Sequence, residues 1–285
     1  GDAFQRDHLL PQAAAIWSAS LAEIHHYPAC AFVRFFENHG LLKLKGRPQW
    51  RTVEGGSRAY VEKLTAPYAA NARLNAGAVS IRRSAEGVFV KDAHGRIECY
   101  DDVVIAAHAD EALAMLDDAS AEERALLSAF RYAKNRAVLH TDPTLMPRRR
   151  KLWASWNYVG DNPEGGCVVS YWMNNLQRIE SREQIFLTLN PRTMPRADAL
   201  LYQTEYDHPL FDAAAIRAQE RLWSLQGGRN TWFCGAYFGA GFHEDGLQAG
   251  LAVAEQLGGL RRPWRVADES GRIHLGAPAP LALAA

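Results

Sequence analysis

The residues with the clearest capacity for chemistry lie in one glycine-rich segment, positions 231–258. Residues 231–234 have the character of a short buried strand, and the following turn contains Gly235, Gly239, Gly241 and Gly246. Glycine has no Cβ, so its backbone can come close to a flat or anionic group. The turn leads into a helix, whose start carries unpaired N–H groups and partial positive charge. This pattern favours a site for a nucleotide or for a reduced flavin, whose pyrimidine edge is negatively charged.

The helix is predicted by a stripe of apolar residues at helical spacing, and Gly258-Gly259 forms its C-terminal stop. The stripe consists of Leu247, Leu251, Ala254 and Leu257. Glu244 and Asp245 suit the start of a helix but would repel a phosphate placed directly against them. An ordinary strand–turn–helix, in which the glycines serve only close packing, is the alternative interpretation.

Residues 241–250, GFHEDGLQAG, resemble the C-terminal flavin-contacting motif of the flavin-containing amine oxidase superfamily. Further stretches are similar to a bacterial branch of FAD/NAD(P)-binding, amine-oxidase-like proteins. They are LPQAAAIWS (10–18), NHGLL (38–42), RPQWRTVEGGS (47–57) and VIAAHAD (104–110). Together with the C-terminal motif they span most of residues 4–258, so the resemblance extends over nearly the whole chain.

The resemblance implies an α/β fold in which an incomplete Rossmann-like FAD-binding domain is interwoven with a substrate domain of one β-sheet and several helices. It implies bound FAD, held by Gly55, Gly56, Val79, Ala106, Gly235, Gly241, Phe242, His243, Asp245, Gly246 and Leu247. In the superfamily the position of Val79 contacts adenine through its backbone. The turn before the last helix lies under the isoalloxazine ring.

The same resemblance divides the chain into five segments. Residues 1–51 are expected to supply substrate-domain helices, 52–110 the middle part of the FAD-binding domain, and 111–210 the rest of the substrate domain. Residues 211–259 complete the FAD-binding domain, and 260–285 form a loose tail.

A complete FAD protein of this superfamily begins with a strand, a G-x-G-x-x-G turn and a helix that hold the pyrophosphate. No such fingerprint occurs in these 285 residues, and the first residue is Gly1. We therefore expect that the chain is a piece of a longer protein that lacks the N-terminal dinucleotide-binding segment.

Local patterns predict the remaining elements. Residues 4–37 are expected to be helical, with breaks at Pro11 and Pro28, and residues 57–64 form a helix. Three short strands are expected at 78–82, 88–92 and 97–100, and a fully buried parallel-sheet strand at 103–107. Residues 110–116, 121–130 and 211–225 are predicted to be helical, and 136–189 to be β-rich.

The β-rich region is loaded with aromatic side chains, which could line an apolar substrate channel or form an ordinary core. The candidates for a channel are Trp153, Trp156, Tyr171 and Trp172. Phe242 occupies the position at which amine oxidases place a tyrosine, so the hydroxyl is lost. His243 could act through its backbone, through its side chain, or face solvent. No residue is identified as a catalytic acid or base.

Other chemistry has little support. His25-His26 with Glu23 lacks the spacing and third ligand of a zinc site, so no metal is expected. No G-x-S-x-G nucleophile accompanies His140 and Asp142, which argues against a hydrolase. Net charge is zero and the pI is about 7.3, which gives no basis for nucleic-acid binding. Four scattered cysteines, expected to be reduced and buried, and the lack of a signal peptide or spanning segment favour a cytoplasmic protein.

The function expected is an FAD-dependent oxidoreductase that transfers hydride from an apolar small molecule to flavin. Relatives of this branch are often encoded beside, or fused to, cyclopropane-fatty-acyl synthases. By association only, this implies an unsaturated fatty-acyl substrate and a synthase-like partner. Two alternatives stay open: a flavoprotein isomerase or saturase acting on lipid, and a non-catalytic lipid-binding module. The sequence names neither the substrate nor the electron acceptor.

Overall fold

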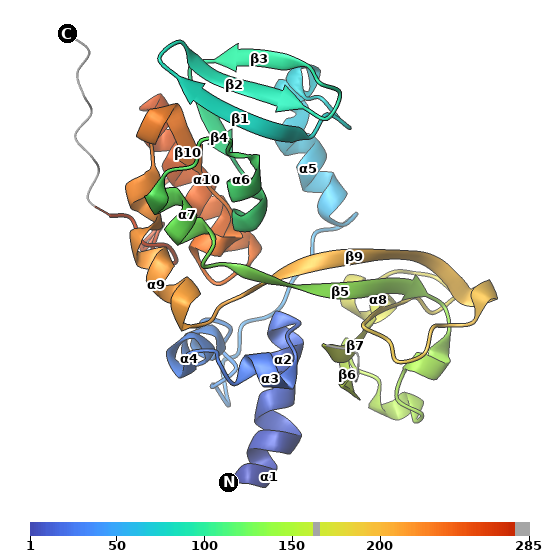
Figure 1. Cartoon of the computed structure of the whole chain (residues 1–285). Helices are drawn as coiled ribbons and strands as arrows, with labels where there is room; N and C mark the ends of the chain where they lie inside the picture. The colour runs from blue at the N-terminus through green and yellow to red at the C-terminus, as the bar shows by residue number, and fades with distance from the viewer. Residues whose placement is uncertain (162–165, 277–285) are drawn as a thin grey trace. The chain divides into compact units, whose positions relative to one another are not determined.

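The computed structural model describes residues 1–161 and 166–276, which form two compact units woven from the same chain (Figure 1). Unit 1 comprises Gly1–Ala72 and Tyr132–Leu210, and unit 2 comprises Arg73–Arg131 and Phe211–Ala285. The chain thus crosses between units at 72, 131 and 210, whereas the resemblance predicted crossings at 51, 110 and 210. The mixed α/β architecture that was predicted is present.

Unit 1 begins with a nearly continuous helical run through α1 (Asp2–Phe4), the π-helical turn η1 (Gln5–Leu9) and α2 (Leu10–Trp17). The predicted break at Pro11 is wrong, because the helical run continues through Pro11, which lies in α2 directly after the π-helical turn η1. The break at Pro28 is confirmed: Pro28 is the N-cap of α4 (Ala29–Asn38). Between them, α3 (Leu21–Ile24) starts with a Ser20–Glu23 capping box. The predicted helix at 57–64 is α5 (Ser57–Thr65), followed by η2 (Ala66–Asn71).

The core of unit 1 is a five-stranded sheet with the order β6-β7-β8-β5-β9. Its strands are β5 (Arg131–His140), β6 (Trp156–Asp161), β7 (Cys167–Trp172), β8 (Phe186–Leu189) and β9 (Leu200–Leu210). The β6–β7, β7–β8 and β8–β5 pairs are antiparallel. Ala14 and Ala15 of α2 pack against Cys167 and Val169, so the helix covers one face of β7. Short helical pieces complete the unit: η3 (Pro143–Leu145), η4 (Arg150–Leu152), α8 (Met173–Gln177) and η5 (Ala197–Ala199).

The other face of this sheet contains a directed chain of polar side chains. His140 is fully buried, and its Nδ1 accepts a hydrogen bond from the Asp142 backbone N–H (3.2 Å). Nε2 therefore carries the proton of the neutral ring and donates to Thr188 Oγ1 (2.8 Å). Ser170 Oγ lies 2.8 Å from the Thr188 hydroxyl and donates to the Leu145 carbonyl. Burial lowers the pKa of His140, against a smaller opposing effect of Asp142.

Unit 2 contains an antiparallel meander of β1 (Ala78–Ser84), β2 (Gly87–Asp92) and β3 (Ile97–Tyr100), as predicted. Strand β4 (Val103–Ile105) pairs in parallel with β10 (Thr231–Phe233), which also matches the prediction. The expectation of a fully buried five-residue strand is wrong, because β4 has three residues and Val104 is 43% exposed. Within the described residues β4 pairs with β10 alone, so its other edge is open.

Four helices of unit 2 follow β4 or flank β10 along the chain. They are α6 (Ala109–Met115), α7 (Ala121–Leu127), α9 (Ala213–Leu222) and α10 (His243–Gly258), with the short turns η6 (Trp223–Leu225), η7 (Gly228–Asn230) and η8 (Ala236–Phe238). The stop predicted at Gly258-Gly259 is confirmed, since Gly259 is the left-handed C-cap of α10. Residues 260–276 were expected to be loose. Instead Arg262 and Ile273 are buried at 8% and 7% exposure.

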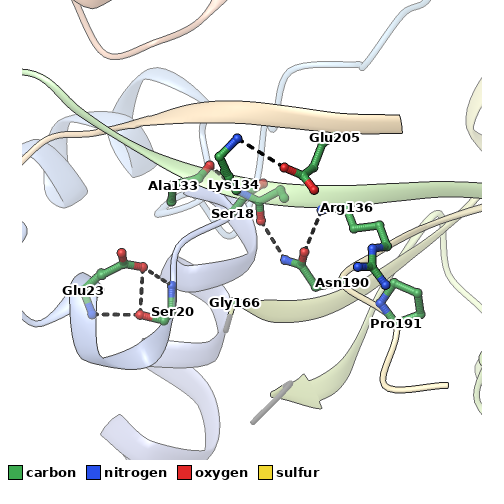
Figure 2. Close-up of a pocket in the computed structure, with 11 residues that line it drawn as sticks. Ser18, Ser20, Glu23, Ala133, Lys134, Arg136, Gly166, Asn190, Pro191 and Glu205 are labelled. Carbon is green, nitrogen blue, oxygen red and sulfur yellow. Dashed lines mark hydrogen bonds and ion pairs between the residues drawn. The ribbon is translucent and has the colours of Figure 1, made fainter. Parts of the chain in front are cut away.

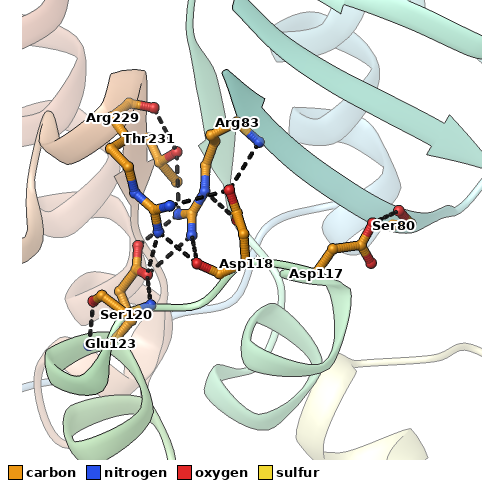
Figure 3. A network of polar contacts seen from close by, with 8 residues as sticks. All are labelled: Ser80, Arg83, Asp117, Asp118, Ser120, Glu123, Arg229 and Thr231. Atoms are coloured by element: carbon orange, nitrogen blue, oxygen red, sulfur yellow. Dashed lines mark hydrogen bonds and ion pairs between the residues drawn. The ribbon is translucent and has the colours of Figure 1, made fainter. Parts of the chain in front are cut away.

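A buried ion cluster holds separate parts of unit 2 together (Figure 3). The Arg83 side chain on β1 is 1% exposed and donates to Asp118 (2.8 Å) and to Glu123 (2.6 Å). Arg229, from the turn before β10, contacts the same two carboxylates. Burial has the largest single effect and would raise the pKa of Glu123, but the hydrogen bonds from Arg83 and Ser120 and the charge of Arg83 together lower that pKa. The cluster joins β1, the start of α7 and the approach to β10.

Replacement of Arg83 by methionine is expected to lower the free energy of unfolding by about 3–5 kcal/mol, because Glu123 would lose its main buried counter-charge. Urea unfolding followed by circular dichroism measures the loss. Arg73→Met is the matched control, since Arg73 pairs with Glu98 at the surface and its removal should change the midpoint little. Equal effects of the two substitutions would contradict a central role for the buried cluster.

The His140 chain predicts a pH dependence. Because the folded protein holds a lowered pKa, protons bind the unfolded state preferentially as the pH falls below about 6.5. Stability should therefore decrease from pH 7 toward pH 5, with a slope of at most about 1.4 kcal/mol per pH unit from this residue. Urea midpoints compared between wild type and His140→Gln isolate the effect, and His25→Gln, an exposed control, should keep it. An unchanged slope in His140→Gln would refute the assignment.

Candidate flavin site

The predicted strand, turn and helix are present as β10, η8 and α10 in unit 2. All three residues of β10 are buried, and the chain then turns through Gly235 and Gly241. Their φ angles are +155° and +90°, so both positions favour glycine. Gln219 on α9 fixes the turn, because its Nε2 donates to the carbonyls of Tyr237 and Gly239. The turn is therefore rigidly held from a helix that precedes it in the sequence.

The first turn of α10 presents unpaired donors. Phe242 is the extended N-cap, and its N–H donates to Asp245 Oδ2 (2.8 Å). The N–H groups of Asp245 and Gly246 both donate to the Phe242 carbonyl. The N–H groups of His243 and Glu244 donate no hydrogen bond to any residue that the structure describes. These two amides, with the helix dipole, can receive a negatively charged group.

Three other predicted contacts at this end have distinct surroundings. Asp245 is 0% exposed and is paired with Arg272, so its carboxylate is used inside the protein. A Cβ on Gly246 would lie 3.6 Å from the Ala236 nitrogen, so this glycine is in ordinary packing contact with η8. Leu247 is 53% exposed and is available to a ligand. Sequence reasoning missed Arg272 and Gln219, because each lies outside the glycine-rich segment it serves.

The remaining predicted cofactor contacts are divided between the units. Gly55 and Gly56, with φ of +80° and +75°, precede α5 in unit 1. Val79 lies on β1 in unit 2 and is 49% exposed. Ala106 lines an apolar cavity of about 580 Å³ in unit 2, bordered by β4, α6 and the meander. The structure brings Ala106 and the β10–α10 turn into one unit and leaves the Gly55-Gly56 turn in the other.

The four predicted substrate-lining aromatics do not form one cluster. Trp156 and Tyr171 are register partners on β6 and β7, with ring centroids 5.5 Å apart, and Tyr171 packs on the face that α2 covers. Trp172 is the next residue of β7 and therefore faces the opposite side. There it contacts Trp153 (5.5 Å), which also packs against Phe186. At most one of these pairs can line a given channel.

Unit 1 also contains a polar cavity of about 340 Å³ (Figure 2). Its lining includes the buried Asn135 and Asn190, whose side-chain amides are hydrogen-bonded to each other (2.7 Å), together with Lys134, Arg136 and Glu205. None of the predicted substrate-lining aromatics borders this cavity. Its wall is polar, unlike the apolar channel that was one of the two interpretations of the aromatic residues.

Other features of the described residues bear on function. No described helix is long and apolar enough to cross a membrane. No group of three or more His, Cys, Asp or Glu in the described part of the chain could hold a metal ion. All four cysteines are free, but Cys30 and Cys99 are exposed, so the expectation that all would be buried is wrong.

Unit 2 thus combines a parallel strand pair, a strand–turn–helix and an antiparallel meander, and unit 1 is a mixed unit of helices and a five-stranded sheet. Several solved structures share this fold. The chain is similar to the CLA-producing fatty acid isomerase from P. acnes, with 17% identity and a TM-score of 0.54, over 81% of this chain and 57% of the isomerase.

Two further structures share the fold. Reduced UDP-galactopyranose mutase matches 97% of this chain and 70% of its own, with 14% identity and a TM-score of 0.57. A protein assigned as a protoporphyrinogen oxidase, from Exiguobacterium sp. 255-15, matches 90% and 64%, with 13% identity and a TM-score of 0.60. The chain thus spans somewhat more than half to about two thirds of these proteins. No protein-family model and no curated protein sequence matches it.

Alanine substitutions of one glycine in the turn before α10 and one glycine within α10 should have opposite effects on stability. A Cβ on Gly239 would lie 2.6–2.8 Å from Asp245 side-chain atoms, so Gly239→Ala should displace a buried carboxylate and destabilise unit 2 by more than about 2 kcal/mol. Gly250 lies within α10 with open space around it, so Gly250→Ala should stabilise by about 0.5–1 kcal/mol. Thermal unfolding of the two variants checks the signs. A neutral Gly239→Ala would show that Asp245 is not fixed by this turn.

Proposed function

We propose that the chain is part of an FAD-dependent oxidoreductase, with unit 2 contributing to the flavin site. The observation that carries this proposal is the pair of unpaired amides of His243 and Glu244 at the start of α10, in a fold shared with flavin amine oxidase structures. Gly55 and Gly56 of unit 1 are proposed as further cofactor contacts, by resemblance. The substrate is proposed to be an apolar small molecule.

The residues present fit a flavin at this place. Two N–H donors and the positive end of a 16-residue helix converge where a pyrimidine edge would carry negative charge. The competing carboxylate of Asp245 is already occupied, and Leu247 offers an apolar contact. When bound, the flavin supplies hydride acceptance, which no amino-acid side chain can provide.

The protein's own residues act by position and charge. The His243 and Glu244 amides would stabilise negative charge at the edge of a bound ring, and the turn held by Gln219 would keep them aligned. Phe242 gives an apolar face without a hydroxyl group. No side-chain acid or base is required in this scheme, so the His243 imidazole is dispensable.

A lipid isomerase is the second candidate function, favoured by the similarity to a fatty acid isomerase. A lipid-binding module without catalysis is the third. Anaerobic addition of unsaturated acyl lipids to the flavin-loaded protein separates the three. Bleaching of the flavin band indicates oxidation of the lipid, and product without bleaching indicates isomerisation. The absence of both bleaching and product indicates a binding module.

The amide donors can be tested without disturbing the helix. His243→Pro removes one N–H at the first helical position, where proline is well tolerated and where extended Phe242 suits a following proline. We expect flavin affinity to fall about tenfold, the value of a hydrogen bond to a charged acceptor. His243→Ala, which keeps the amide, should bind normally. The chain lacks a G-x-G-x-x-G turn, so weak binding is expected and FAD fluorescence is titrated up to its solubility limit.

Equal loss of affinity in both variants would instead assign the role to the imidazole. Unchanged affinity in both would refute the proposed placement of the flavin. Thermal unfolding in the absence of flavin should be similar for wild type and the two variants.

A further inference from the structure

Arginines anchor the segment after α10 to that helix. We call residues 260–276 the C-terminal strap. Arg262 donates to Glu255 (2.6 Å), and Arg272 donates to Asp245 through Nε (2.6 Å) and Nη2 (3.2 Å). The Arg272 backbone N–H also donates to Gln248, and the next side chain, Ile273, is buried. The strap is therefore fixed to the first two turns of α10 at Asp245 and Gln248.

Asp245 poses an electrostatic problem for the start of α10. Its side chain is fully buried, and it occupies the third position of the helix, next to the unpaired amides of His243 and Glu244. A carboxylate here caps the Phe242 N–H, but its charge would oppose any anion that approaches those amides. Glu244 has a smaller effect because it is exposed to solvent, which screens its charge.

We propose that Arg272 is a positioning residue for the flavin: it neutralises Asp245, so that the start of α10 stays positive while Asp245 still caps the helix. The proposal rests on the flavin site proposed above. It assigns to the strap a part in cofactor affinity, although no strap residue needs to touch the cofactor. The physical cause is a guanidinium that forms two hydrogen bonds with a carboxylate buried beside the site.

Three variants test this role by two measurements, thermal unfolding without flavin and FAD titration. Arg272→Met leaves Asp245 buried and unneutralised, so it should lower Tm and weaken FAD binding about tenfold or more. Adding Asp245→Asn to Arg272→Met removes the excess charge, and the asparagine carbonyl can still accept the Phe242 N–H. The double variant should recover FAD affinity. Arg261→Met is the control, because the half-exposed Arg261 pairs with Glu269 on the strap and, at 3.8 Å, with Glu255, and not with Asp245.

The outcomes separate the two proposals. If wild type binds FAD and Arg272→Met binds it equally well, the positioning role is wrong even when Tm falls. If the double variant recovers Tm but not affinity, the charge argument is also wrong. If wild type takes up no FAD at any concentration, the flavin site itself is refuted and the role of Arg272 toward flavin with it. The Tm values of the variants would then describe only the Asp245–Arg272 pair.

Discussion

The buried guanidinium of Arg83 is the constraint on which the architecture of unit 2 depends. A cation removed from water requires nearby carboxylates with good geometry. Asp118, in the loop after α6, and Glu123, on α7, provide them. Arg229 completes the charge balance from the turn that leads into β10. The ion pairs of this cluster fix the start of β10. Since β10 leads directly to Gly235 and α10, they also fix the position of the candidate site within unit 2.

The same solution recurs at the site. Asp245 and Glu255 on α10 each meet an arginine from the C-terminal strap, Arg272 and Arg262. The polar core of unit 1 contains two neutral pairs, His140 with Thr188 and Asn135 with Asn190. Its buried Asp142 carboxylate accepts hydrogen bonds from the backbone N–H groups of Thr144 and Arg196. The difference has a physical consequence. Protonation of His140 should disturb unit 1 at mildly acidic pH, whereas the arginine pairs of unit 2 persist until their carboxylates are protonated.

Elements with a strong local pattern could be predicted from the sequence. The meander, α5, the β10–α10 unit and the Gly259 stop follow from alternation, helical spacing and glycine chemistry. The separation of the aromatic residues onto two faces of the sheet could also have been predicted, because Tyr171 and Trp172 are adjacent in a strand and must face opposite sides. The roles of Arg83 and Arg272 could not be predicted, since their partners lie 27 to 40 residues away and form no periodic pattern with them in the sequence. The strap was mistaken for a tail because its order comes from those ion pairs and not from secondary structure.

The fold alone does not select a reaction, because an isomerase and a mutase share it with oxidases. Two amides at a helix start stabilise negative charge in any reaction that develops it there, with or without net oxidation. The reaction class must therefore be set by the groups that hold the substrate.

In this chain the aromatic pairs on opposite faces of the unit 1 sheet offer two different apolar surfaces, Trp156 with Tyr171 and Trp153 with Trp172. Burial raises the pKa of the Tyr171 phenol to about 12, so this side chain remains a neutral packing group. Trp153 and Trp172 have their indole N–H groups bonded to Pro147 and Gln184. Each pair thus presents mainly apolar surface, which cannot transfer a proton. Under the proposed function such a surface would orient an apolar chain, and redox or isomerisation chemistry would fall to the flavin.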